Sequence, residues 1–189
     1  MENPRIMLDL PRWLDPFLER RGEVWETEVE RMQLAVDLSR LNTRHRTGGP
    51  FGAAVFEEPS GRLLSIGVNL VVRAHCSVAH AEIVALILAQ QGRGRHNLGG
   101  EGGSPPCQLV TSCEPCAMCL GAIPWSGVQS VVCGALGEDA ESIGFDEGAK
   151  PSDWAAGLES RGIRVIRGVL RDRAKAVLLE YPQGGGVLY

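Results

Sequence analysis

Two short segments of the sequence combine residue types that bind zinc with one that moves protons. His80 is followed two positions later by Glu82, and Pro115 directly precedes a Cys116-x-x-Cys119 pair. One imidazole and two thiolates leave the fourth tetrahedral position of a zinc ion open, which is typical of catalytic rather than structural zinc sites. Because Glu82 is not needed as a ligand, its carboxylate can take a proton from water and deliver it to a leaving group. The set predicts one zinc ion per chain and hydrolytic release of ammonia from an amidine-like ring carbon.

Nearby thiols offer a competing interpretation. Cys113, three residues before Cys116, or Cys76 could supply a fourth ligand and close the zinc site into a structural one. A structural site would have no use for Glu82, so the open, catalytic site is the favoured interpretation.

The elements expected around these residues would bring them together. His80 should begin a buried helix over residues 80–90, and the two cysteines should lie in the first turn of another helix over residues 114–123. Cysteines three positions apart share one helical face, and the positive end of a helix lowers the pKa of a thiol. Pro115 suits a first turn, where its missing N–H would have no partner. Two helix N-termini should therefore converge on the metal.

Strand-like and helix-like stretches alternate along the chain, which predicts a sheet covered by helices on both faces. We expect a single three-layer α/β/α domain over residues 23–189, with a mixed, mainly parallel five-stranded sheet, after an irregular N-terminal extension over residues 1–22. The expected strands are residues 51–57, 62–69, 108–112, 128–133 and 163–169. The expected helices are residues 23–44, 80–90, 114–123, 154–161 and 172–180, and a mobile loop is expected over residues 92–106.

Composition narrows the classes of partner. The net charge of -4 gives no general attraction for polyanions, so nucleic acid is an unfavoured partner. The N-terminus shows no apolar signal segment, and no run approaches the roughly 18 apolar residues of a membrane span. In a reducing cytoplasm, which is the predicted location, six clustered cysteines are more often metal ligands than disulfides.

The segments H-A-E at 80–82 and P-C-A-M-C at 115–119 resemble the zinc-dependent cytidine deaminase superfamily. Three further stretches are similar to bacterial guanine deaminases of this fold: G-G-P-F-G-A-A-V-F at 48–56, N-L-V-V at 69–72 and I-G-F-D-E-G at 143–148. The resemblance covers most of the chain. It implies a cytidine deaminase-like domain, with a C-terminal closing segment, that uses zinc to convert guanine to xanthine and ammonia.

The resemblance also implies roles for individual residues. Glu147 matches the family's second catalytic acid and would pass protons to the departing 2-amino group, with its neighbour Asp146 a less favoured candidate. Asn69 would hydrogen-bond the purine edge, and Phe51 would stack on the ring. Without the resemblance, Asn69 could cap a turn, Phe51 could be a core aromatic, and the two acids could be solvated loop charges.

The same resemblance implies a quaternary structure. Relatives are homodimers in which the C-terminal segment can cross to close the partner's site, which implies a homodimer here and a place for Tyr189 over the substrate. Trp125 would form a wall of the pocket, although it could equally be a core aromatic.

Three functional hypotheses follow. The first is a deaminase of guanine, or of a close relative such as guanosine, another aminated purine or an amino-triazine. The second is a tRNA adenosine deaminase, which uses the same zinc motif but needs a basic face to hold phosphates. The third is a non-enzymatic, zinc-stabilised protein, which would have no need of Glu82.

Overall fold

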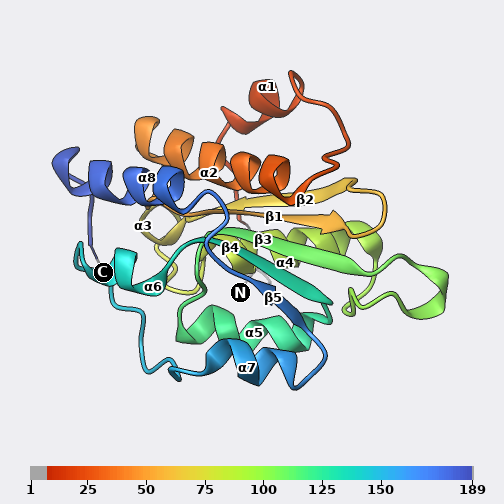
Figure 1. Cartoon of the computed structure of the whole chain (residues 1–189). Helices are drawn as coiled ribbons and strands as arrows, with labels where there is room; N and C mark the ends of the chain where they lie inside the picture. Colours follow the sequence, from red (N-terminus) through yellow and green to blue (C-terminus); the bar gives the residue numbers. More distant parts are fainter. Residues whose placement is uncertain (1–7, 189) are drawn as a thin grey trace, which may run out of the picture.

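The computed structural model describes residues 8–188, in which five strands form one sheet (Figure 1). The strands are β1 (Gly52–Glu57), β2 (Leu63–Val68), β3 (Cys107–Cys113), β4 (Ser130–Ala135) and β5 (Arg164–Ile166), in the spatial order β2-β1-β3-β4-β5. β1 is antiparallel to both β2 and β3, whereas β4 is parallel to β3 and β5. The mixed sheet is confirmed. The expectation of a mainly parallel sheet is also confirmed, because β2, β3, β4 and β5 all point the same way. Only β1, which a short turn joins to β2 as an antiparallel hairpin, runs against them.

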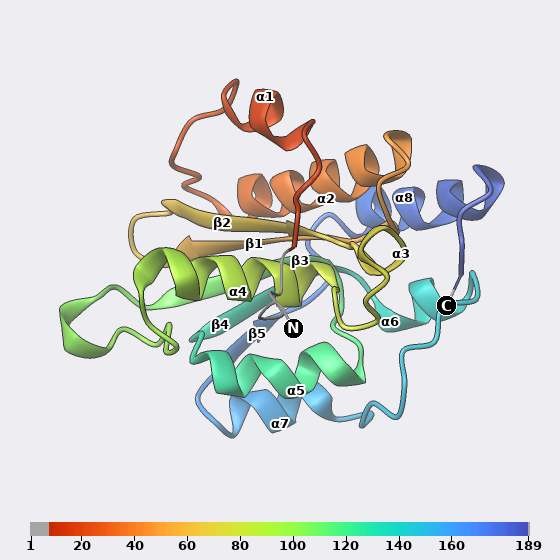
Figure 2. The ribbon, with the colours of Figure 1, turned by 180° about the vertical axis from the view of Figure 1, so that it is seen from behind.

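Two helical layers cover the sheet (Figures 1 and 2). α2 (Glu28–Arg44) and α8 (Arg171–Gln183) lie on one face, and α4 (Ala81–Arg93), α5 (Ala117–Ser126) and α7 (Trp154–Glu159) lie on the other. Along β1, Ala54 and Phe56 pack with the first layer, and Ala53 and Val55 pack with the second. This alternation is the period of two expected for a strand between two cores. The three-layer α/β/α arrangement is confirmed.

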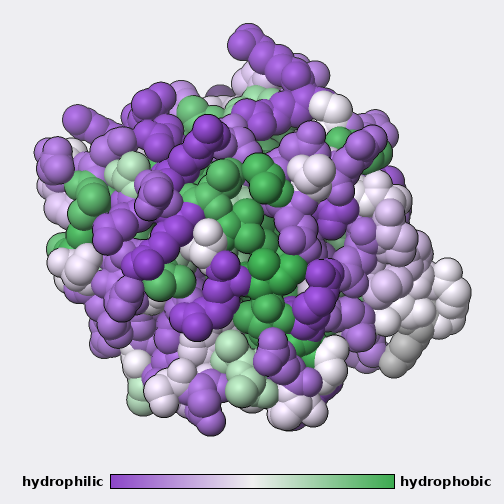
Figure 3. Space-filling view, viewed as in Figure 1, coloured by the Kyte–Doolittle hydropathy of each residue, from purple (hydrophilic) through white to green (hydrophobic). Residues whose placement is uncertain are grey.

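Short helices fill the connections. They are α1 (Leu14–Leu18), α3 (Val71–Ala74), α6 (Gly137–Glu141) and the 3-10 turn η1 (Glu101–Gly103). Within residues 8–188, no helix combines the length and the apolar character needed to cross a membrane. The edge strand β5 faces the viewer in Figure 1, and Figure 3 shows an apolar band over this region, flanked by hydrophilic residues.

The N-terminal part of α2 differs from the prediction. The helix begins at Glu28 rather than near residue 23, because Thr27 accepts a hydrogen bond from Glu30 N at 3.2 Å and the Glu30 side chain accepts one from Thr27 N at 2.9 Å. This capping box fixes the start of the helix. The chain before the cap runs beside the β1–β2 turn instead, where Trp25 N donates to Gly61 O at 2.9 Å.

The N-terminal extension is more ordered than expected over its described part. Residues 14–18 form α1, Leu14 is only 1% exposed in the core, and Trp13 Nε1 donates to Thr47 Oγ1 at 3.0 Å. Residues 1–7 lie outside the described part of the chain. Residues 8–18 therefore contribute to the packing against α2.

The close packing of α4 on β2 depends on Gly67. A Cβ atom at this position would lie 2.0 Å from Ala81 O and 2.6 Å from Ala85 N. Nearby, Ser65 Oγ donates to Ala85 O at 2.7 Å. Any larger residue at position 67 would push the first turn of α4 off the sheet, and that turn carries Glu82.

Candidate active site

The zinc-motif residues lie at the starts of two helices. His80 is the N-cap of α4 and Cys116 is the N-cap of α5, both with extended backbone, and Cys119 is buried in the first turn of α5. β3 ends at Cys113, so the chain enters α5 directly from the carboxyl end of that strand. The predicted convergence of two helix N-termini is confirmed.

The three donor atoms are spaced as a zinc ion requires. Cys116 Sγ and Cys119 Sγ lie 3.5 and 3.6 Å from His80 Nδ1. Zinc–sulfur bonds of about 2.3 Å and zinc–nitrogen bonds of about 2.0 Å at tetrahedral angles place sulfur and nitrogen about 3.5 Å apart. The pKa of Cys116 is lowered to about 4, chiefly by the hydrogen bond from Cys119 and further by His80, so this thiol gives up its proton readily. These residues fit the ion.

The described residues supply three zinc ligands and no fourth one. Among residues 8–188, the only His, Cys, Asp and Glu side chains grouped closely enough to hold a metal are His80, Cys116 and Cys119. Cys113 Sγ is instead within 3.6 Å of Leu136 O. The closed, structural site completed by Cys113 or Cys76 is therefore not formed.

A cavity of about 200 Å³ adjoins the cluster. Its walls come from five segments of the chain, and the lining residues are Phe51, Asn69, His80, Glu82, Glu114, Cys116, Phe145, Asp146 and Glu147. The rings of Phe51 and Phe145 meet edge to face at 4.9 Å and form an apolar wall. Asn69 is 1% exposed, and its Oδ1 accepts a hydrogen bond from Val71 N at 3.3 Å. Both predicted binding residues, Phe51 and Asn69, thus line the cavity, and Asn69 also caps a turn.

Two carboxylates are buried in this cavity. Glu82, in the first turn of α4, and Glu147 are each 6% exposed. Burial raises the pKa of Glu82 above its ordinary value and raises the pKa of Glu147 to about 7, with Lys150 opposing the second shift. Glu147 Oε2 has no hydrogen-bond partner among residues 8–188 and lies 3.5 Å from Lys150 Nζ. A carboxyl that titrates near neutral pH is suited to accept and return a proton.

Three other predicted residues have different surroundings. Asp146 is exposed, and its Oδ1 accepts a hydrogen bond from Gly148 N at 2.8 Å, which closes the turn after Glu147. The pocket-wall role of Trp125 stays a prediction, and within its own chain the side chain is 87% exposed and lies outside the cavity lining. The reason is helical phase, since Trp125 lies on the outer face of α5, away from the buried Cys119. Tyr189 lies outside the described residues.

Two cavity residues escaped the sequence analysis. Glu114 and Phe145 both line the cavity and are buried. Glu114 had a usable signal, because it is a charged residue placed directly after an apolar strand and directly before the zinc motif. Phe145 lies inside the 143–148 segment, in which the sequence assigns roles only to the two acids.

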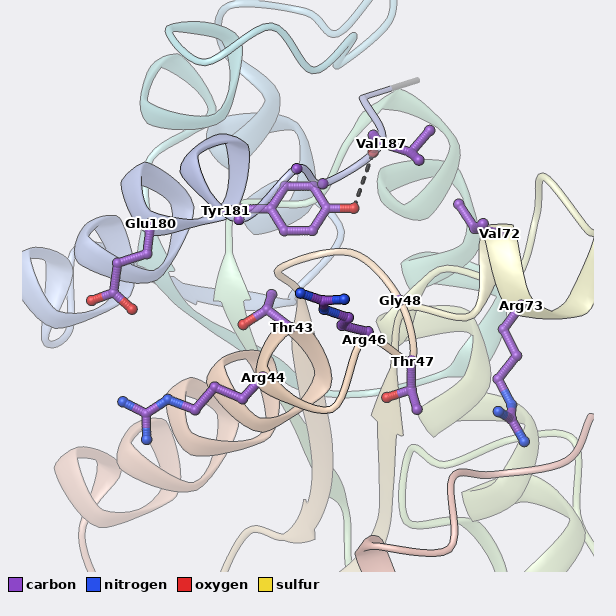
Figure 4. Close-up of a pocket in the computed structure, with 13 residues that line it drawn as sticks. Thr43, Arg44, Arg46, Thr47, Gly48, Val72, Arg73, Glu180, Tyr181 and Val187 are labelled. Carbon is purple, nitrogen blue, oxygen red and sulfur yellow. Dashed lines mark hydrogen bonds between the residues drawn. The ribbon is translucent and has the colours of Figure 1, made fainter.

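A second cavity, of about 520 Å³, lies between the end of α2, α3 and the C-terminal segment (Figure 4). It shares a boundary with the first, because Tyr181 in its wall stacks on Phe145 at 5.9 Å. The Tyr181 hydroxyl donates to Val187 O at 3.0 Å. Figure 4 shows the side chains of Arg44 and Arg73 pointing in different directions, away from the centre. Its lining includes no histidine or cysteine, so this cavity does not compete as the catalytic one.

The model of a known protein family matches this chain. Described as the cytidine and deoxycytidylate deaminase zinc-binding region, it covers residues 26–135, which is more than half of the sequence. This chain belongs to that family. The predicted fold, the zinc cofactor and the assignment as a hydrolytic deaminase are thereby confirmed, in agreement with the His80, Cys116 and Cys119 cluster.

Individual relatives point to one branch of the family. The structure of a guanine deaminase from Nitrosomonas europaea is 48% identical, with a TM-score of 0.90, and covers 97% of this chain and 99% of that one. A structure solved with 2,6-diaminopurine is 49% identical, with a TM-score of 0.89 and coverage of 97% and 95%. A guanine deaminase from Bacillus subtilis is 37% identical over 116 residues, or 61% of this chain and 69% of that protein.

Proposed function

We propose that this deaminase family member converts guanine and water to xanthine and ammonia. The observation that carries the proposal is a small cavity in which two buried carboxylates, Glu82 and Glu147, face one zinc-binding cluster. The similarity over nearly the whole chain to a guanine deaminase structure supports guanine as the substrate.

The side chains divide the work of the reaction. Phe51 and Phe145 hold the purine ring and exclude water from its faces, and Asn69 orients the ring by hydrogen bonding to its edge. The zinc ion, held by His80 and the two cysteines, would supply Lewis-acid activation of the attacking water. Glu82 takes a proton from that water and passes it to the ring nitrogen N3 while the water oxygen bonds to C2. Glu147 delivers a proton to the 2-amino group and recovers one from the new C2 hydroxyl, as the C2–N bond breaks and ammonia leaves.

The size of the cavity favours the free base over the nucleoside. Pockets for drug-sized ligands occupy about 300–1,000 Å³, and this cavity is smaller, at about 200 Å³. A fused pair of rings fits such a volume more readily than a base with an attached ribose. Guanosine and bulkier aminated rings are therefore second candidates.

A tRNA substrate has less support. Nucleic-acid binding relies on a basic surface that neutralises phosphates, whereas this chain carries a net charge of -4. Of the arginines that line the 520 Å³ cavity, Arg44 and Arg73 point in different directions (Figure 4).

We also propose that the protein is a homodimer of the cytoplasm. α5, which carries Cys119, is apolar around its circumference and leaves Trp125 87% exposed, as expected for a helix covered by a second copy. The cytoplasmic location fits the need to keep Cys116 and Cys119 reduced for zinc binding.

An ammonia-release assay tests the substrate. The zinc-loaded protein should deaminate guanine with the highest kcat/KM in a panel that also contains guanosine, adenine, cytosine, cytidine and a diamino-triazine. A preference for any other compound in the panel would overturn the assignment to guanine.

A variant then tests the second acid. Glu147→Gln should lower kcat for guanine by at least about 100-fold, the contribution typical of a general acid, with zinc content unchanged. Glu159→Gln, at an exposed site that does not line the cavity, is the matched control and should retain full activity. Normal turnover by Glu147→Gln would show that Glu147 has no part in proton transfer.

A further inference from the structure

Lys150 contacts three groups beside the catalytic cavity. Its Nζ lies 3.2 Å from Pro115 O, 3.5 Å from Glu147 Oε2 and 3.9 Å from Glu114 Oε2. We propose that Lys150 is a positioning residue, which fixes the Glu147 carboxylate relative to the peptide that leads into Cys116. This inference rests on the proposed role of Glu147 in deamination.

The local chain path explains how Lys150 reaches Glu147. Gly148 N donates to Asp146 Oδ1 and Lys150 N donates to Gly148 O, both at 2.8 Å, so the chain turns sharply and brings the lysine back over the glutamate. Ala117 N donates to Glu147 O at 2.9 Å and ties the same turn to the first turn of α5. The acid, the lysine and the zinc-binding helix thus form one connected unit.

Room for the ammonium group is provided by Gly137. A Cβ atom there would lie 2.6 Å from Lys150 Nζ, and Gly137 N donates to Glu114 Oε2 at 3.0 Å. The ammonium group therefore occupies a space that only glycine leaves open. Since that atom is the end of a flexible side chain, an alanine at position 137 would displace it without breaking the backbone.

The surrounding charges direct Lys150 toward Glu147. Arg167 Nε lies 2.5 Å from Glu114 Oε1 and supplies that carboxylate with a closer cation. Among residues 8–188, Lys150 is the only cation that forms an ion pair with Glu147. The Lys150 side chain is 12% exposed, so this interaction is little weakened by solvent.

Residue usage agrees with a specific role. The chain has 17 arginines but only two lysines, Lys150 and Lys175. An ammonium group is a compact charge that can sit among three oxygens, whereas a guanidinium group is a wide plane with donors in fixed directions. The oxygens of Pro115, Glu147 and Glu114 all lie within 3.9 Å of the single Nζ atom of Lys150, an arrangement that suits an ammonium group better than a guanidinium group.

A double-mutant cycle tests the inference with the zinc-loaded chain and guanine. Lys150→Met should lower kcat by about tenfold or more, since small misplacements of catalytic groups carry losses of this size, with KM nearly unchanged. If Lys150 acts through Glu147, adding Lys150→Met to Glu147→Gln should cause no further loss. Gly137→Ala moves the ammonium group of Lys150 but keeps its charge. It should lower kcat in the wild-type background and have no effect in the Glu147→Gln background.

Lys175 provides the matched control. Its Nζ pairs with Asp139 Oδ1 at 2.9 Å between α6 and α8, and neither residue lines the cavity, so Lys175→Met removes an ion-paired lysine from outside the site and should keep the wild-type kcat. Equal fractional losses from Lys150→Met with and without Glu147, or no loss at all, would overturn the inference. A wild-type protein that is inactive on guanine would refute the proposed function instead, and the cycle would then be measured on the best substrate of the panel.

Discussion

Glu147 should destabilise the fold whenever it is ionised, so Glu147→Gln should stabilise the protein at alkaline pH. Burial raises the pKa of this carboxyl from its ordinary value of 4.5 to about 7, so the folded protein holds the proton more tightly than the unfolded chain does. The stability contributed by the bound proton is fully present below about pH 4.5 and is lost as the pH rises through about 7. Glutamine has nearly the same shape and stays neutral throughout.

The size of the effect follows from the two pKa values. A gap of about 2.5 at about 1.4 kcal/mol for each pH unit gives about 3 kcal/mol. The side chain is only 6% exposed, so solvent screening reduces this figure little. The free energy of unfolding of Glu147→Gln should exceed that of the wild type by about 1 kcal/mol at pH 5 and by about 3 kcal/mol at pH 8.5.

Urea unfolding of the two zinc-loaded proteins at both pH values measures this difference. Zinc binding contributes to the stability of both proteins, so its own pH dependence cancels when they are compared at the same pH and zinc concentration. The exposed Glu159→Gln should show no pH-dependent advantage. An advantage of Glu147→Gln that stays constant with pH, or a loss of stability at pH 8.5, would falsify the argument, because Glu147 would then be well accommodated as a carboxylate.

Three further outcomes follow from the site and the fold. Cys116→Ser should lose zinc and activity, whereas Cys113→Ser should keep both, as measured by metal analysis and ammonia release. Loss of zinc from Cys113→Ser would show that Cys113 is a zinc ligand. Gly67→Ala should lower the free energy of unfolding by about 3 kcal/mol or more, because its Cβ would lie 2.0 Å from Ala81 O; an unchanged melting temperature would contradict this packing. Trp125→Ser should shift the mass measured by light scattering from dimer to monomer, and a persistent dimer would mean that α5 is not the interface.

The metal centre could be predicted from the sequence because its information is local. Two segments of a few residues contain all three ligands and Glu82, and each ligand owes its position to the start of one helix. The spacing of Cys116 and Cys119 follows from the helical repeat alone. The chain order of strands and helices was enough to predict a layered α/β domain that brings such helix starts to one edge of a sheet.

The rest of the cavity depends on contacts between distant segments, which a single sequence does not reveal. Glu114 interacts with Arg167 and Lys150, which lie far along the chain, so neither partner could be recognised from its neighbours in sequence. Trp125 shows a different limit of a single sequence. Its residue type suggested a pocket wall, but the direction of its side chain is set by the rotation of α5 about its axis, which the zinc ligands determine. The pairing of β1 with β3 could not be predicted from the sequence either, because the two strands are far apart in the chain and α4 lies between them.

The charge balance of the cavity connects the ligand set with the behaviour of the acids. Two thiolates would offset the double positive charge of a zinc ion, so the metal centre would give Glu147 little electrostatic reason to ionise. Burial raises the pKa of Glu147 to about 7, and Lys150 opposes this rise. A ligand set with more imidazole and less thiolate would leave the ion positively charged and would favour the ionised carboxylate. A neutral metal centre beside one lysine therefore suits an acid that must hold a proton at neutral pH and still be able to release it.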